Sequence, residues 1–232
     1  MQKRFLSTFV VLLTLIGSVS RGSDWTEVGN GGDVIVCRRG PQTYTMYDAY
    51  ESEHRYSLSP KYPPYQDIDR TEHPHNSKEY FYVAAQIAQS MVERLRHLDP
   101  VRYRKYSDWI SQYESEAQFL DNATLTDIPD TGIGTLPAGC YLEQLIIQRP
   151  PLFPGQPRYM IAHDFWRYMS FEDQVVAILH EVIYRDARDS DPKVRSSERV
   201  RYFNALIISD KISRMSLEEY RKSVDVVFRP TP

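Results

Sequence analysis

An apolar segment at the N-terminus constrains this chain of 232 residues more than any other feature. Lys3 and Arg4 precede the apolar run FLSTFVVLLTLIG (residues 5–17), and Ser-Val-Ser follows it at 18–20. A basic start, an apolar run and a small-x-small step is the order of a secretory signal peptide. An uncleaved anchor is the alternative, but the run is shorter than the roughly 20 residues that a membrane span needs. We therefore expect residues 1–20 to be a signal peptide and the protein to be exported, either periplasmic or secreted.

The remainder of the chain, residues 21–232, has the length of one ordinary globular domain, about 210 residues. It contains no further stretch long and apolar enough to cross a bilayer, and a proline-rich loop is expected near 57–76. Removing residues 1–20 takes away two cations and no acid, so the formal net charge changes from −3 to −5. This mild acidity argues against a nucleic-acid partner, which would favour a basic surface.

Two cysteines, Cys37 and Cys140, are present in the whole chain. In an oxidising export compartment an even pair most often forms a disulfide. The alternative is two buried free thiols. The sequence favours the disulfide, which would close a loop of about a hundred residues and stabilise the fold by up to about 4–5 kcal/mol in the chain-entropy model.

The hydrophobic pattern predicts an α+β fold, with a small antiparallel sheet packed on several helices. The expected strands are 34–37, 43–47, 140–148 and 158–162, with a possible edge strand at 225–228. The expected helices are 77–98, 101–119, 170–185, one after Pro192 and a short last helix that begins at a capping box, Ser216 to Glu219. Residues 186–191 are expected to form a charged loop.

The helix predicted from Ser170 carries the one segment with recognisable chemistry, His180-Glu181. At about 100° per residue, its main apolar stripe lies on the side opposite His180, which points toward other apolar residues. The helix is thus apolar nearly all round, and an enclosed imidazole needs a hydrogen-bonding or metal partner. Tyr184, one turn later, is the nearest candidate.

This segment resembles the active-site helix of zincin metallopeptidases, whose motif is His-Glu-x-x-His. The resemblance implies a zincin-like strand–helix element, a possible zinc ion, His180 as its first ligand and Glu181 as the general base. Tyr184 stands where the second histidine ligand would be, and phenol, with its pKa near 10, is a poor replacement for imidazole. Glu198 or His163 would have to complete the ligand set.

The chain also resembles a group of uncharacterised exported bacterial proteins. The similar segments are Gly31 to Cys37, Pro137 to Cys140, Leu179 to Arg185 (Leu-His-Glu-x-x-Tyr-Arg) and Ser197 to Arg201. This likeness spans most of the chain after residue 20. It implies export and the same His-Glu segment, and no activity.

A second polar stripe is expected on the helix after Pro192. Its members are Ser197, Arg201 and Asn204. We expect this stripe to face His180 and Glu181 as a polar network. The simpler alternatives are ion pairs of Glu181 with Arg201 or with Arg185.

Two functions are compatible with this pattern. The first is an exported binding or structural module on a zincin-like scaffold that lacks zinc chemistry. The second is a metal-dependent, peptidase-like hydrolase with an altered ligand set: His180, Tyr184 and a third group such as Glu198, with Glu181 as base. Neither a ligand nor a partner is indicated by the sequence.

Overall fold

The structure is a computed structural model and describes residues 32–37, 43–65, 78–127, 130–194 and 196–228. The expected signal peptide, residues 1–20, lies outside the described residues. So does most of the expected proline-rich loop; its beginning, 57–65, contains neither helix nor strand.

The first sheet has the strand order β2-β1-β4, and both pairings are antiparallel. The central strand β1 (Asp33–Cys37) pairs with β2 (Thr43–Met46) on one edge and with β4 (Cys140–Gln144) on the other. The middle of β1, Val-Ile-Val, is buried on both faces, as expected of β-branched residues in a central strand. The strands expected at 34–37 and 43–47 are thus present, and they pair with each other.

The second sheet has the strand order β3-β6-β5. Strand β6 (Tyr159–Ala162) pairs antiparallel with β5 (Ile146–Gln148) and parallel with β3 (Ala117–Leu120). The prediction of one strand over 140–148 was wrong, because the chain passes from the first sheet to the second at Leu145. The Leu145 amide donates to Gly32 O (3.2 Å), and its carbonyl accepts from the Ala162 amide (2.9 Å). Strand β3 was predicted as the end of a helix.

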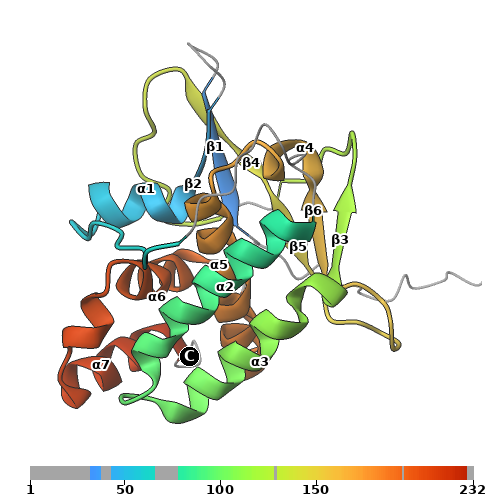
Figure 1. The fold of residues 1–232 in the computed structure, drawn as a ribbon. Helices are drawn as coiled ribbons and strands as arrows, with labels where there is room; N and C mark the ends of the chain where they lie inside the picture. Colours follow the sequence, from blue (N-terminus) through green and yellow to red (C-terminus); the bar gives the residue numbers. More distant parts are fainter. Residues whose placement is uncertain (1–31, 38–42, 66–77, 128–129, 195, 229–232) are drawn as a thin grey trace, which may run out of the picture.

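Most of the remaining described residues are helical. Together with the two small sheets, these helices give an α+β fold, as predicted. The α-helices are α1 (Tyr47–His54), α2 (Lys78–Val92), α3 (Pro100–Glu116), α4 (His163–Trp166), α5 (Phe171–Ser190), α6 (Glu198–Ile208) and α7 (Leu217–Phe228). Two 3₁₀ turns, Glu93–Leu95 and Lys211–Arg214, join them. Both sheets lie to one side of the molecule, and α2, α3, α6 and α7 gather on the other (Figure 1). None of the described helices is long and apolar enough to span a membrane.

Two predicted boundaries were wrong, and burial explains both. The expected charged loop at 186–191 continues α5, because Asp186 is buried and accepts hydrogen bonds from Arg102, Lys105 and Tyr106. The expected edge strand at 225–228 is the last turn of α7. Buried side chains recur along α7 at helical spacing, ending in Val227 and Phe228, so its pattern is that of an amphipathic helix.

Helix α5 is the centre of the fold. It contacts α1, α2, α3, α6, α7 and β2. Ser170 caps it, since the Ser170 Oγ accepts from the Asp173 amide (3.0 Å) and donates to Asp173 Oδ2 (2.7 Å). Most of its side chains are buried all round its circumference, as the sequence indicated, and His180 and Glu181 are among them.

A disulfide joins Cys37 and Cys140, which face each other at one end of the β1–β4 ladder. Their Cα atoms are 4.2 Å apart, and the two residues are 103 positions apart in the sequence. A bond between directly opposed residues of an antiparallel pair fixes the register of those strands. It also encloses β2, α1, α2, α3 and β3 in one covalent loop.

Candidate functional site

His180 is enclosed, as its place on α5 predicted, with 1% of its surface exposed. Its Nδ1 donates to Asp48 Oδ2 (2.8 Å), a fully buried carboxylate on α1. Burial opposes the imidazolium charge, but the charge and hydrogen bond of Asp48 outweigh burial and raise the pKa of His180 to about 9. The partner is therefore Asp48, which the sequence analysis missed.

Glu181 is fully buried, and both of its carboxylate oxygens accept hydrogen bonds. Its Oε1 accepts from the Gly32 amide (2.9 Å), just before β1, and its Oε2 accepts from Gln148 Nε2 (2.7 Å) on β5. The same Gln148 amide also donates to the Glu181 carbonyl (2.9 Å). Burial raises the pKa of this carboxyl, although His180, Gln148 and Gly32 oppose the shift. Glu181 thus connects α5 to both sheets.

Two further side chains lie next to the His180–Asp48 pair. The ring of Tyr184 stacks on it at 23°, with 6.2 Å between ring centroids. Asn204 of α6 donates through Nδ2 to Asp48 Oδ2 (2.7 Å) and to the Val176 carbonyl (3.0 Å). Asp48 therefore connects the imidazole of α5 to the polar stripe of α6.

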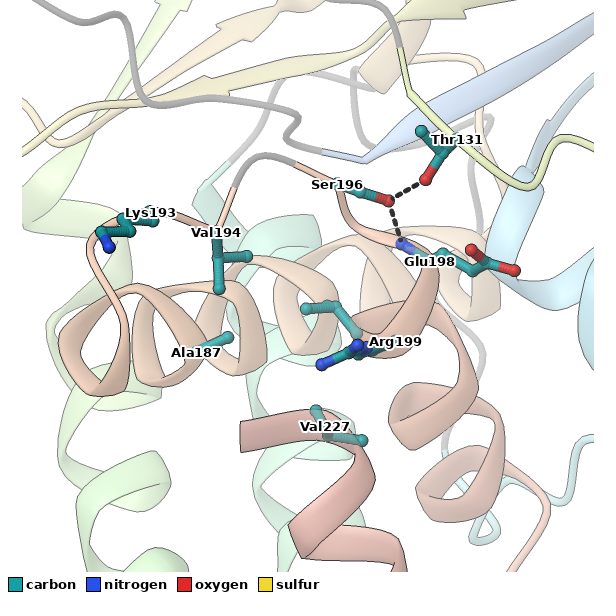
Figure 2. Close-up of a pocket in the computed structure, with 9 residues that line it drawn as sticks. Thr131, Ala187, Lys193, Val194, Ser196, Glu198, Arg199 and Val227 are labelled. Carbon is teal, nitrogen blue, oxygen red and sulfur yellow. Dashed lines mark hydrogen bonds between the residues drawn. The ribbon is translucent and has the colours of Figure 1, made fainter. Parts of the chain in front are cut away.

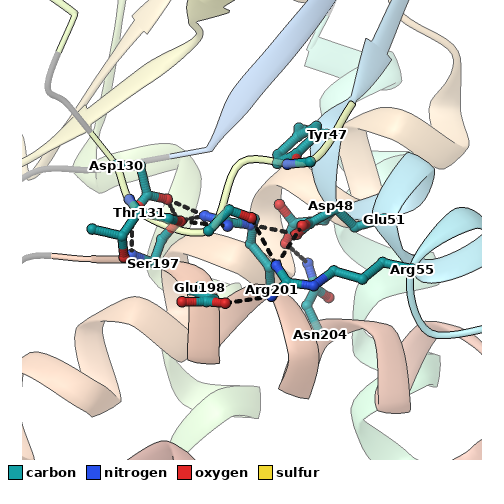
Figure 3. A network of polar contacts seen from close by, with 12 residues as sticks. Tyr47, Asp48, Glu51, Arg55, Asp130, Thr131, Ser197, Glu198, Arg201 and Asn204 are labelled. Atoms are coloured by element: carbon teal, nitrogen blue, oxygen red, sulfur yellow. Dashed lines mark hydrogen bonds and ion pairs between the residues drawn. The ribbon is translucent and has the colours of Figure 1, made fainter. Parts of the chain in front are cut away.

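Arg201 of α6 is the centre of a second buried network, drawn in Figure 3. Only 1% of its side chain is exposed, and Nε donates to Glu51 Oε2 of α1 (2.5 Å). Its Nη1 donates to Asp130 and to Ser197 Oγ (2.8 Å), and its Nη2 to the Thr131 carbonyl (3.0 Å). Buried side chains with this many charge-assisted bonds hold their elements in one arrangement.

The segment 130–135, which we call the strap, lies over this network (Figure 3). Besides the Arg201 bonds, Arg55 donates to the Gly132 carbonyl (2.8 Å) and Tyr50 to the Thr135 carbonyl (3.1 Å). Gly132 has a φ of +70° and its Cα faces the carboxylate of Glu198, so a side chain there would be strained and would collide. The strap thus closes the outer side of the network.

Asp33, at the start of β1, is a further buried acid near both networks. Burial raises its pKa to about 7, and the charge of Asp130 adds to the shift while His180 and Arg201 oppose it. Its Oδ1 accepts no hydrogen bond from any described residue. The cluster therefore contains an acid that titrates close to neutrality.

Of the predicted polar stripe on α6, Ser197 and Arg201 bond to Asp130 and to each other, and Arg201 also bonds to Glu51. Within the described residues, neither forms a hydrogen bond with His180 or Glu181. The α6 stripe reaches His180 through Asn204 and Asp48. Neither alternative ion pair of Glu181 is found: Arg201 pairs with Glu51 and Asp130, and Arg185 pairs with Glu116 (2.9 Å).

The predicted zinc ligands do not converge. The Glu198 carboxylate pairs with Arg55 at the strap, and His163 Nδ1 is bonded to Asp121 Oδ1 (2.6 Å). Tyr184 lies parallel to the imidazole of His180. Among the described residues, no group of three or more His, Cys, Asp or Glu side chains is arranged to hold a metal ion. The residues present therefore do not fit a zinc site of the expected composition.

A hollow of about 210 Å³ lies beside the Arg201 network (Figure 2). Its lining comes from the strap, from α5, α6 and α7, and from the connection between α5 and α6: Thr131, Ala187, Lys193, Val194, Ser196, Glu198, Arg199, Val200 and Val227. Ser196 Oγ accepts hydrogen bonds from Thr131 Oγ1 (2.6 Å) and from the Glu198 amide (3.2 Å). These polar groups of the lining are therefore already bonded to one another. Among the described residues that line it, Glu198 is the one acid, Lys193 and Arg199 are exposed cations, and none is a buried reactive group.

No protein-family model, curated protein or solved structure matches the chain. The resemblances to zincins and to exported bacterial proteins stay predictions.

Proposed function

We propose that the chain is an exported binding or structural module, in which His180 and Glu181 maintain the fold. The observation that carries this proposal is the bonding of Glu181. Both oxygens of its fully buried carboxylate accept hydrogen bonds, from the Gly32 amide and from Gln148. The disulfide, which suits an oxidising compartment, is compatible with export.

A general base must reach a reacting water or substrate proton at about 2.6–3.2 Å. Glu181 instead directs its two oxygens at the backbone before β1 and at a side chain of β5. These contacts are the ones expected of a carboxylate that joins a central helix to two sheets. His180, held by Asp48 against α1, has the equivalent role on the other side of the helix.

The metal-dependent hydrolase is the competing proposal, and zinc analysis separates the two. We would purify the chain from residue 21 without a tag and measure bound zinc by mass spectrometry after incubation with zinc. The binding-module proposal predicts less than about a tenth of an equivalent. A full equivalent that disappears in His180→Ala would overturn it.

The Glu181→Gln variant provides a second, independent measurement. A glutamine amide would turn its NH₂ group toward one of the two donors, so we expect a loss of about 1–3 kcal/mol in unfolding free energy. Glu218→Gln is the matched control, since the Glu218 side chain is 79% exposed and should change stability by less than about 0.5 kcal/mol. Unchanged stability in Glu181→Gln, together with loss of a peptidase activity, would support the hydrolase.

A further inference from the structure

The strap, residues 130–135, is held in place by side chains. No backbone–backbone hydrogen bond joins it to any other described residue, and it belongs to neither sheet. Its one large apolar side chain, Ile133, is 40% exposed and is not part of either hydrophobic core. Few buried apolar contacts and the lack of a backbone ladder are typical of a segment of low local stability. The strap can therefore open while the helices beneath it stay folded.

Four side chains from the rest of the protein bond to the backbone of the strap. The four bonds join the Tyr47 hydroxyl to the Gly134 amide (2.7 Å), the Tyr50 hydroxyl to the Thr135 carbonyl (3.1 Å), Arg55 to the Gly132 carbonyl (2.8 Å) and Arg201 to the Thr131 carbonyl (3.0 Å). Bonds of this kind hold a backbone whatever side chains it carries, and main-chain bonds supply affinity in peptide-binding sites. We call these four side chains, together with Ser197, the seat.

Asp130 is the one charged residue of the strap, and its side chain is only 2% exposed. Its Oδ2 accepts hydrogen bonds from Ser197 Oγ (2.6 Å) and from Arg201, and its Oδ1 accepts from the Ser197 amide (3.1 Å) (Figure 3). Burial opposes ionisation of this carboxyl, but the charge of Arg201 and the bond from Ser197 outweigh burial and lower its pKa. The seat thus contains a specific site for one carboxylate, bonded by a cation and a hydroxyl.

The position of Gly132 adds a second requirement. Its φ is +70°, which side chains rarely adopt, and a Cβ there would collide with the Glu198 carboxylate. The next side chain, Ile133, is turned largely to solvent and contributes little to recognition. The seat therefore fits a segment with aspartate at its first position and glycine at its third, which we write Asp-x-Gly.

We propose that the seat is a peptide-binding site which the strap occupies in the free protein, and that an Asp-x-Gly segment of a partner protein binds there by displacing the strap. The partner forms the bonds that now hold the strap, so the buried guanidinium of Arg201 becomes available to it only when the strap leaves. The strap is then an autoinhibitory contact, and the apparent affinity for the partner is reduced by the fraction of molecules whose strap is open. This inference rests on the proposed binding function and names the class of partner.

Gly132→Ala tests the proposal, because it destabilises the closed strap and leaves every residue of the seat in place. Alanine is strained at a φ of +70°, and its methyl group would displace the Glu198 carboxylate. The probe is a fluorescent peptide with the strap sequence DTGIGT and blocked ends, titrated with the chain from residue 21 and followed by fluorescence anisotropy. We expect it to bind Gly132→Ala at least about tenfold more tightly than the parent, since a larger fraction of molecules has an open strap. The peptides NTGIGT and DTAIGT should each bind Gly132→Ala at least about tenfold more weakly than DTGIGT does.

The matched control is Gly155→Ala, since Gly155 also has a positive φ (+85°) but lies outside the strap with open space around it. This variant should bind the peptide no more tightly than the parent. Within the Gly132→Ala background, Arg55→Met should weaken binding by about fivefold, because it removes the bond to the carbonyl of the third position. Urea unfolding shows whether Gly132→Ala is folded. If it is not, Asp130→Asn takes its place, since it weakens the hold of the strap on Arg201, and the same gain in binding is expected.

Three results would each overturn the proposal: equal binding to the parent and to the open variant, no binding to either, and equal binding of the three peptides. A dimer of the open variant in sedimentation without peptide would also overturn it, because the seat would then take the strap of a second copy. None of these measurements depends on zinc content. A failure here is therefore distinguishable from a failure of the proposed function.

Discussion

Arg201→Met should destabilise the protein strongly, because it removes the buried guanidinium at the centre of the network while retaining much of the apolar bulk of the side chain. Arg201 bonds Glu51, Asp130, Ser197 and the strap carbonyl of Thr131. With the guanidinium gone, the Asp130 and Glu51 carboxylates, each with only 2% of its side chain exposed, would lose that charge, and Glu51 would keep only its pair with the more exposed Arg55.

Breaking one partner of a fully buried ion pair is destabilising by about 3–5 kcal/mol, because an uncompensated charge is left behind. We expect Arg201→Met to lie in that range, a large part of the roughly 5–15 kcal/mol that stabilises a domain. Arg201→Lys should be intermediate, since an ammonium keeps the charge but not the fork that bonds several acceptors at once.

The matched control is Arg55→Met, because Arg55 also bonds Glu51 (2.9 Å) but is 38% exposed. Exposed ion pairs contribute about 0–1 kcal/mol, so this variant should be near neutral. Urea unfolding at pH 7, followed by tryptophan fluorescence with the disulfide intact, measures all three. A loss below about 1 kcal/mol in Arg201→Met, or equal losses in the two methionine variants, would refute the assignment of stability to the buried network.

The disulfide and the titrating cluster give two more predictions. Cys37→Ala/Cys140→Ala should lower the unfolding free energy by up to about 4–5 kcal/mol, measured by urea unfolding, and thiol labelling of the unfolded parent should find no free thiol. Stability should also fall as pH rises toward 9. The raised pKa of His180 contributes stability that is fully present below about pH 6.5 and is lost as pH rises through about 9. The raised pKa of Asp33 acts in the same direction, because ionising this buried carboxyl opposes folding as pH rises toward about 7. In His180→Gln the slope above pH 6.5 should flatten; an unchanged slope in denaturation midpoints would contradict the assignment.

Local patterns in the sequence predicted the fold class and the elements with clear periodicity. The helical spacing of apolar residues located α2 and α5, and short runs of β-forming residues located strands β1 and β2. The predictions were wrong where contacts between distant parts of the chain determine where an element begins or ends. The break at Leu145 exists because its backbone groups bond to Gly32 and Ala162, which belong to different sheets, and no local signal marks this change of partner.

The sequence predicted the part of the site that depends on one helix and missed the part that depends on contacts between distant elements. Helical geometry on α5 showed that His180 would be enclosed. Asp48 could not be identified as its partner, because it lies 132 residues away and shares a polar stripe with Glu51 and Ser52 that resembles an exposed face. In the structure that stripe is the buried side of α1. The polar partners of a buried cluster can be recognised only when the elements that carry them are placed in space.

The position of β4 in the chain has a consequence for biosynthesis. Strand β1 can pair with β2 as soon as both have been synthesised, but its other edge is completed by a strand whose cysteine lies 103 residues further on. During that interval a short, strongly apolar strand presents an unsatisfied edge, which is a template for intermolecular pairing. Nascent or truncated chains that end before Cys140 should therefore depend on a chaperone to stay unaggregated, and full-length chains should not.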